Sequence, residues 1–91
     1  MTDRPILLVQ TPWDTRDQWA AELRAALPEL EVRVWPDDPD PARVVACAVW
    51  QPPAELLAGH PGLRVIQSLG AGLDHLWKLG AALPDLPVLR L

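Results

Sequence analysis

With 91 residues the chain can form one small domain, and its 49% apolar content excludes a disordered protein. The net charge of −4, and the lack of any apolar run near the roughly 18 residues of a membrane span, argue against nucleic acid and membranes as partners. A single cysteine, Cys47, and a start without signal-peptide features indicate a reducing, cytoplasmic setting.

The first half of the chain predicts a strand, a helix and a second strand. Residues 5–9 form a short continuous apolar run, typical of a strand buried on both faces. A helix should follow, because Thr15 and Gln18 fit a capping box and Pro28 ends the helical pattern. Residues 31–35 alternate with period two and predict a half-exposed edge strand. The apolar face of the helix is expected to contain Trp19, Leu23, Ala26, Leu27 and Leu30.

An acidic, proline-rich loop covers residues 36–41. Its carboxylates lack the spacing of a metal-binding loop, so a solvated surface loop is favoured. Residues 44–50 predict another buried strand, and residues 54–58 a short helix that begins after Pro53 and ends at Gly59.

Residues 63–77 are the most informative stretch. Their apolar run stops abruptly at the Gly70-Ala71-Gly72 turn, and a short amphipathic segment follows, which predicts strand, tight turn and helix. In an open α/β sheet such a junction lies at the carboxyl edge, where ligands bind. Glycines allow close approach of a ligand, and free amides at a helix start favour an anion. We therefore predict that residues 69–73 form an anion-binding loop.

Residues 88–91 resemble a further strand, so strands and helices alternate along the whole chain. This order predicts a doubly wound parallel α/β sheet of about five strands. Because the sequence stops within an apolar strand, we expect it to be part of a longer protein or to be completed by another component.

Several nucleotide-binding and catalytic motifs are absent. A dinucleotide fingerprint would need glycine where His75 stands, and no phosphate-binding P-loop occurs. Ser68 is not in a nucleophile elbow, and Cys47 is expected to be a buried, inert thiol.

The two histidines are the neutral-pH acid/base candidates. His60 precedes a strand, away from the expected site, so a structural role is favoured. His75 follows the glycine loop and could face a ligand, but a structural or rim role is favoured because its one nearby carboxylate is its neighbour. That neighbour, Asp74, is expected to interact with the first helix amides.

Three runs carry a resemblance: 49–53 (Val-Trp-Gln-Pro-Pro), 63–75 (Leu-Arg-Val-Ile-Gln-Ser-Leu-Gly-Ala-Gly-Leu-Asp-His) and 83–91 (Leu-Pro-Asp-Leu-Pro-Val-Leu-Arg-Leu). The sequence resembles the D-isomer-specific 2-hydroxyacid dehydrogenase family, in particular its glyoxylate/hydroxypyruvate reductase A type. The resemblance implies a flavodoxin-like substrate domain, which in this family is split around a Rossmann domain that binds NAD(H) or NADP(H). It also implies reduction of a small 2-oxo acid to the D-2-hydroxy acid by a homodimer.

Carried over by position, the resemblance implies that the amides of Gly70, Ala71 and Gly72 hold the substrate carboxylate. Trp50 maps to a residue that lines the substrate pocket, and a partly buried strand-end aromatic is an equally good interpretation. The family's cofactor fingerprint, arginine, glutamate and histidine all belong to sequence beyond residue 91. We therefore assign no catalytic, cofactor-binding or metal-binding residue.

The resulting hypothesis is that residues 1–91 are the amino-terminal substrate-binding segment of an NAD(P)H-dependent 2-oxoacid reductase, inactive alone. The alternative is a stand-alone, non-catalytic flavodoxin-like domain that binds a small carboxylate or a protein partner. In a third interpretation, the glycines only make a tight connection between strand and helix.

Overall fold

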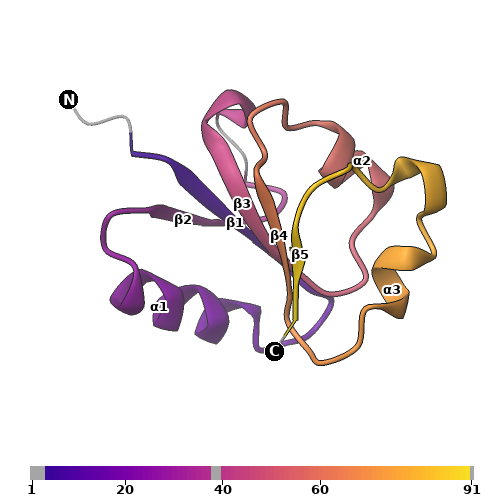
Figure 1. Ribbon diagram of the computed structural model, residues 1–91. Helices are drawn as coiled ribbons and strands as arrows, with labels where there is room; N and C mark the ends of the chain where they lie inside the picture. The colour runs from indigo at the N-terminus through magenta and orange to yellow at the C-terminus, as the bar shows by residue number, and fades with distance from the viewer. Residues whose placement is uncertain (1–3, 38–39, 91) are drawn as a thin grey trace.

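Strands and helices alternate in the computed structural model, which describes residues 4–37 and 40–90 (Figure 1). The elements are β1 Ile6–Gln10, α1 Arg16–Ala26, β2 Glu31–Val34, β3 Val44–Val49, α2 Ala54–Ala58, β4 Val65–Ser68, α3 Asp74–Trp77 and β5 Val88–Leu89, with short 3-10 turns η1 Pro41–Arg43 and η2 Gly80–Ala82. The predicted order of elements is confirmed. Within the described ranges, no helix is long and apolar enough to cross a bilayer.

All five strands form one parallel sheet in the order β2-β1-β3-β4-β5. This is the flavodoxin-like order, so the predicted fold class is confirmed. Helix α1 covers one face of the sheet, and α2 and α3 lie over the other (Figure 1). From β1 the chain passes to β2 on one side of β1, and from β2 it crosses to β3 on the other side of β1. The carboxyl ends of β1 and β3 therefore flank the topological switch point, where such sheets bind ligands.

Alternate residues of β1 belong to two separate hydrophobic cores. Ile6 and Leu8 pack with α2 and α3, whereas Leu7 and Val9 pack with Ala20 of α1. Because both faces of β1 are covered, its sequence is apolar without a polar alternation.

Helix α1 begins and ends where the sequence predicts, but two details of the prediction are wrong. Thr15 is the residue before the helix, yet its side chain caps no amide, because its backbone (φ −83°, ψ 7°) lies outside the extended region that a capping residue normally adopts. Ala26, expected on the apolar face, is exposed, since it lies in the last turn beyond the edge of the sheet-facing stripe.

Strand β2 is the predicted edge strand, and its outward backbone carbonyls have partners. Leu30 accepts a long hydrogen bond from Arg4 (3.5 Å), Val32 accepts from Arg24 (3.0 Å), and Val34 accepts from the Asp37 amide (2.8 Å). These bonds occupy the carbonyls through which a further strand would pair at this edge and so disfavour such pairing.

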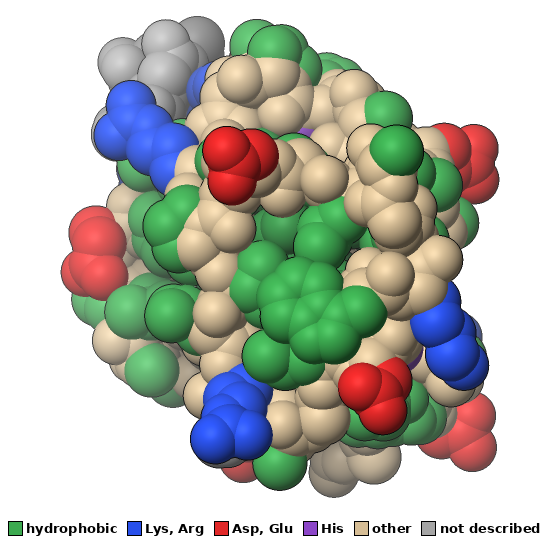
Figure 2. Space-filling view, turned by 45° about the vertical axis from the view of Figure 1, so that its right-hand side comes forward, with side chains coloured by type: hydrophobic (Ala, Val, Ile, Leu, Met, Phe, Trp, Pro, Cys, Tyr) green, Lys and Arg blue, Asp and Glu red, His purple; other side chains and the backbone are tan. Residues whose placement is uncertain are grey.

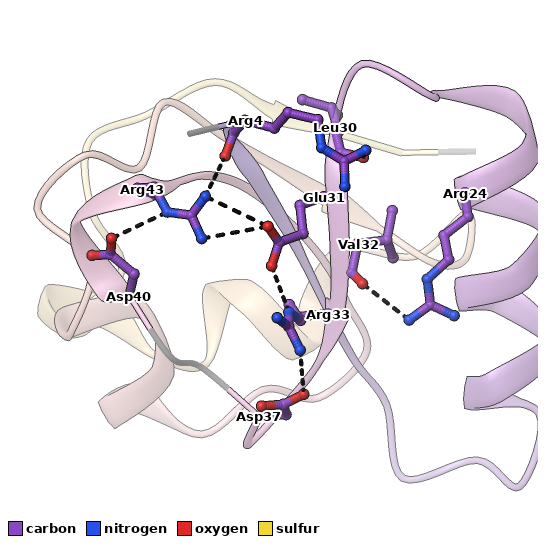
Figure 3. A network of polar contacts seen from close by, with 9 residues as sticks. All are labelled: Arg4, Arg24, Leu30, Glu31, Val32, Arg33, Asp37, Asp40 and Arg43. Atoms are coloured by element: carbon purple, nitrogen blue, oxygen red, sulfur yellow. Dashed lines mark hydrogen bonds and ion pairs between the residues drawn. The ribbon is translucent and has the colours of Figure 1, made fainter. Parts of the chain in front are cut away.

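An ion-pair network ties β2 to η1 (Figure 3). Glu31 pairs with Arg33 (2.6 Å) and Arg43 (3.4 Å), while Arg43 also pairs with Asp40 (3.1 Å). The hydrogen bond from Arg33 lowers the pKa of Glu31. The predicted solvated loop thus contributes Asp40 to a local ion pair, while its residues 38–39 lie outside the described residues.

Candidate functional site

The carboxyl ends of β1, β3 and β4 bring three loops together. The Trp50 amide donates to the Gln10 carbonyl (3.0 Å), and the Leu69 amide donates to the Val49 carbonyl (2.9 Å). These bonds continue the sheet by one residue beyond each strand. The glycine loop, residues 69–73, therefore begins beside Trp50 and close to the switch point.

Gly70 and Gly72 meet different surroundings. A Cβ on Gly70 would lie 2.7 Å from Cζ3 of the Trp50 ring, closer than real atoms approach, so the absence of a side chain here lets the indole pack on the loop. A Cβ on Gly72 would come no nearer than 3.9 Å, to Trp50 Cη2, which is an ordinary contact. The missing side chain at Gly70 therefore accommodates the Trp50 ring, whereas the space beside Gly72 is not filled by other residues.

The loop amides also differ in their partners. The Gly70 amide donates a long hydrogen bond (3.3 Å) to Ser68 Oγ. Among the described residues, no acceptor is found for the amides of Ala71 and Gly72. Two of the three amides assigned to carboxylate binding are therefore unpaired.

Helix α3 is a single turn of four residues, Asp74–Trp77. So short a helix adds little macrodipole, and the predicted contribution of a helix start to anion binding is accordingly small. Asp74 lies in this first turn as expected, but it is exposed and no side-chain hydrogen bond caps the helix. Attraction for an anion at this site therefore has to come from the loop amides.

His75 lies inside the molecule, not at the rim. Only 9% of its surface is exposed, its Nδ1 accepts the Gln51 amide (2.9 Å), and its Nε2 lies 3.0 Å from Ser68 Oγ. Because an amide can only donate, Nδ1 carries the lone pair and Nε2 carries the proton of a neutral ring. Burial lowers the pKa of His75, partly offset by the Gly72 backbone and by Asp74.

The Ser68–His75 contact has the wrong polarity for nucleophilic catalysis. A histidine base would need an unprotonated Nε2 facing the hydroxyl and an acceptor beside a protonated Nδ1. Here Nδ1 faces a donor, and Ser68, with 0% of its surface exposed, gives its own proton to the Gly72 carbonyl (3.0 Å). The geometry therefore excludes a serine hydrolase at this position.

Trp50 is half-buried between two aromatic rings. Its indole lies 5.4 Å from the Trp13 ring and 4.2 Å from the His75 ring, measured between centroids. It both packs against the core under α1 and keeps part of its surface exposed beside the glycine loop. Both sequence interpretations of Trp50 are compatible with this position.

Sequence reasoning missed Ser68, Gln51 and Gln10 as parts of this site. Gln51 has φ 51°, a left-handed conformation that is uncommon for residues other than glycine. Gln10, at the end of β1, has a buried side-chain oxygen for which the described residues provide no donor. Their positions in the sequence could have indicated these residues, because each lies at the end of a predicted parallel strand or directly after it.

His60 is buried in another part of the fold, as the sequence predicts. Its Nδ1 contacts the Leu56 carbonyl, and its ring lies edge-on to Trp35 at 6.3 Å. The described residues contain no cluster of three potential metal-binding side chains. A surface hollow of about 560 Å³ lies at β2, lined by Arg4, Arg24 and Arg33, and is remote from the glycine loop.

Comparison with known proteins finds similar sequences and structures over nearly the whole chain. No family model matches the chain. Glyoxylate/hydroxypyruvate reductase A of Escherichia fergusonii is 44% identical over 94% of this chain. A D-isomer-specific 2-hydroxyacid dehydrogenase of Xanthobacter autotrophicus Py2, solved with NADPH and MES, superposes over 97% of the chain with a TM-score of 0.85 and 35% identity. The resemblance to the D-isomer-specific 2-hydroxyacid dehydrogenase family is confirmed.

A second solved member of this family has a more specific name. The NADPH-dependent glyoxylate/hydroxypyruvate reductase of Sinorhizobium meliloti, in complex with NADP and sulfate, is 27% identical over 96% of the chain, with a TM-score of 0.75. The chain spans 28% of the Escherichia protein, 29% of the Xanthobacter chain and 28% of the Sinorhizobium chain. It thus matches less than a third of each of these dehydrogenases.

The glycine loop does not fit the pyrophosphate of a dinucleotide cofactor. The position that a pyrophosphate-binding fingerprint reserves for glycine is His75, whose buried ring is hydrogen-bonded to Gln51 and Ser68. The following helix has a single turn. No cofactor-binding role is therefore assigned to this loop.

Proposed function

We propose that residues 1–91 are the substrate-binding segment of an NADPH-dependent 2-oxoacid reductase that acts on glyoxylate or hydroxypyruvate. The observation that carries this proposal is the pair of unpaired amides at Ala71 and Gly72, beside Trp50 at the carboxyl edge of the sheet. Similarity to glyoxylate/hydroxypyruvate reductases over nearly the whole chain supports the substrate class. The NADPH and NADP in two solved relatives support the cofactor.

In this proposal the chain binds and orients the substrate. Two amide donors suit a carboxylate, and the Trp50 indole limits the space beside it to a small organic acid. Hydride donation requires the nicotinamide of a cofactor, and in this proposal the cofactor binds outside this segment. His75 cannot donate its Nε2 proton to a substrate, because that proton is directed at buried Ser68. Reduction then depends on sequence beyond residue 91, and we place the cofactor domain and a homodimer contact in the longer protein.

An amide-resolved titration of the 91-residue chain with glyoxylate tests substrate binding. We expect the Ala71 and Gly72 resonances to shift with an affinity in the millimolar range, about −4 kcal/mol, because the segment provides only neutral donors. Glyoxylamide, in which a neutral amide replaces the carboxylate, is the matched control. Equal responses to the two compounds, or none, would contradict the proposal.

Turnover is tested on the protein encoded by the complete reading frame. We expect NADPH oxidation with glyoxylate or hydroxypyruvate, and its loss when Gly72 is replaced by a larger residue. The alternative of a non-catalytic carboxylate-binding domain predicts the same titration result with no turnover in any form of the protein.

A further inference from the structure

Ser68 connects both ends of the glycine turn. Its hydroxyl oxygen accepts the Gly70 amide (3.3 Å), and its hydroxyl proton goes to the Gly72 carbonyl (3.0 Å). The side chain is fully buried at the end of β4, so a rigid strand holds it in place. One hydroxyl group thus fixes the spacing across residues 70–72.

His75 fixes the direction in which the Ser68 hydroxyl points. Because Nδ1 accepts the Gln51 amide, the protonated Nε2 donates to Ser68 Oγ. The hydroxyl then has two donors facing its oxygen, and the Gly72 carbonyl is the acceptor for its proton. The hydrogen bonds therefore run in one direction, from the Gln51 amide through His75 and Ser68 to Gly72.

The start of this chain of bonds is a strained residue. Gln51 follows Trp50 with φ 51°, and this left-handed turn aims its amide at the imidazole. Strained backbone persists where the surrounding structure over-determines it, and such residues cluster at binding sites. The Trp50 ring, 4.2 Å from the His75 ring, holds the imidazole from the side.

The consequence for the loop follows from peptide geometry. In a trans peptide the carbonyl and the amide point to opposite sides. With the Gly72 carbonyl turned toward Ser68, the amide of Leu73 in the same peptide unit is turned away from Ser68. The amides of the two preceding residues, Ala71 and Gly72, have no acceptor among the described residues.

We propose that Ser68 and His75 are positioning residues, which hold residues 70–72 in the conformation that presents free amides to a substrate carboxylate. This inference rests on the proposed function, because a carboxylate is the ligand that the amides would meet. His75 acts through Ser68 and touches no substrate. It performs this role as the neutral ring with its proton on Nε2.

The tautomer of His75 is the first test, and it needs no ligand. Nitrogen chemical shifts of the imidazole at neutral pH should show a protonated Nε2 and an unprotonated Nδ1. A proton on Nδ1 would overturn the inference, because the Gln51 amide could not then donate to it. This measurement is made on the wild-type chain and so does not depend on the folding of any variant.

Variants test the effect on the loop. Ser68→Ala should move the amide resonances of residues 70–72 and weaken glyoxylate binding about tenfold, and Ser68→Thr, which keeps the hydroxyl, should restore binding. His75→Gln, which keeps a donor near Ser68, should retain more binding than His75→Leu. His60→Leu is the matched control, since it removes a buried imidazole elsewhere and should leave binding unchanged.

The outcomes separate this inference from the proposed function. If the wild-type amides do not respond to glyoxylate, the proposed function fails, while the tautomer and the loop resonances of Ser68→Ala still decide the positioning role. If glyoxylate binds the wild type and equally well binds folded Ser68→Ala, the positioning role fails and the proposed function stands.

Discussion

Gly70 and Gly72 flank the same alanine, but a side chain would meet different obstacles at the two positions. Gly70→Ala should lower the free energy of unfolding by about 1–3 kcal/mol, because the new Cβ would overlap the Trp50 ring. Gly72→Ala should leave stability nearly unchanged, since its Cβ has room, but should weaken carboxylate binding by entering the open space. Urea unfolding and glyoxylate titration of both variants measure the two effects.

This pair of variants also tests the third sequence interpretation, in which the glycines only form a tight connection. That interpretation requires carboxylate binding to survive in folded Gly72→Ala. Binding that survives there would contradict a substrate role for the loop.

The protonation of His75 should make stability depend on pH. Its native pKa is below the ordinary value of 6.5, so between the two values the unfolded chain binds more protons than the folded one. The free energy of unfolding should therefore fall as the pH drops below about 6.5 and be independent of this group above it. Asp74 is the charged group that partly opposes this shift.

Urea midpoints between about pH 7.5 and pH 5.5 measure this dependence, in a range where most carboxylates stay ionised. His75→Gln is the control, and its midpoint should change less over the same range. A wild-type midpoint that rises on acidification would show that the folded protein prefers the charged imidazole.

Cys47 provides a reporter of global unfolding. Burial raises the pKa of its thiol to about 12, and the residue is fully buried in the middle of β3. Because the thiolate is the reactive form, we expect no labelling by a thiol reagent in the native state and fast labelling in urea. Fast native labelling would mean that the sheet opens around β3.

At the scale of elements, α3 depends on its packing, because one helical turn is not stable by itself. Leu76 is its fully buried contact with the core, whereas the next residue, Trp77, is 53% exposed. Leu76→Ala should destabilise the protein by about 2–5 kcal/mol, a large part of the total for a domain of this size. Trp77→Ala is the matched control with a small expected change, and thermal unfolding of both variants distinguishes them.

The order of the elements follows from local sequence, because parallel strands and amphipathic helices have distinct periods. Residues 44–49 and α1 were predictable in this way, and the abrupt stop at Gly70 placed the candidate site. The capping of α1 was not predictable, since Thr15 has a suitable side chain in an unsuitable backbone conformation.

The interior of the site was predictable only in part. His75 contacts residues 24 and 7 positions away in the sequence, and such separations are set by the packing of α3 against the ends of β3 and β4. The sequence alone therefore placed His75 near the loop but could not show that its ring turns inward. The hydrogen bond that Nδ1 accepts could not be predicted either, because its donor is the backbone amide of Gln51 and not a side chain.

At the scale of the whole molecule, the two edges of the sheet differ. The outward carbonyls of β2 are occupied, whereas β5 pairs with β4 alone among the described strands. Leu89 of β5 is 50% exposed, and Figure 2 shows hydrophobic side chains gathered at the centre of one face, with charged ones toward its margin. An open edge beside exposed apolar surface favours association.

We therefore expect the 91-residue chain to associate as its concentration rises, and Leu89→Lys to reduce this association. Ala21→Lys, which adds the same charge on the exposed side of α1, is the control and should have little effect. Sedimentation over a range of concentrations measures the outcome. A monomer at every concentration, or an equal response of both variants, would contradict the role of the β5 edge.

The contact between Trp13 and Trp50 has an optical consequence. The chain contains five tryptophans and neither tyrosine nor phenylalanine, so its near-ultraviolet absorption and emission come from indole rings. Two of those rings lie 5.4 Å apart, and one of them also touches His75. Such a pair should give coupled circular dichroism bands, and the indole emission should depend on how far Trp50 is buried. A ligand that displaces Trp50 would change both signals. Binding at the glycine loop can therefore be followed by intrinsic tryptophan signals, without an attached dye.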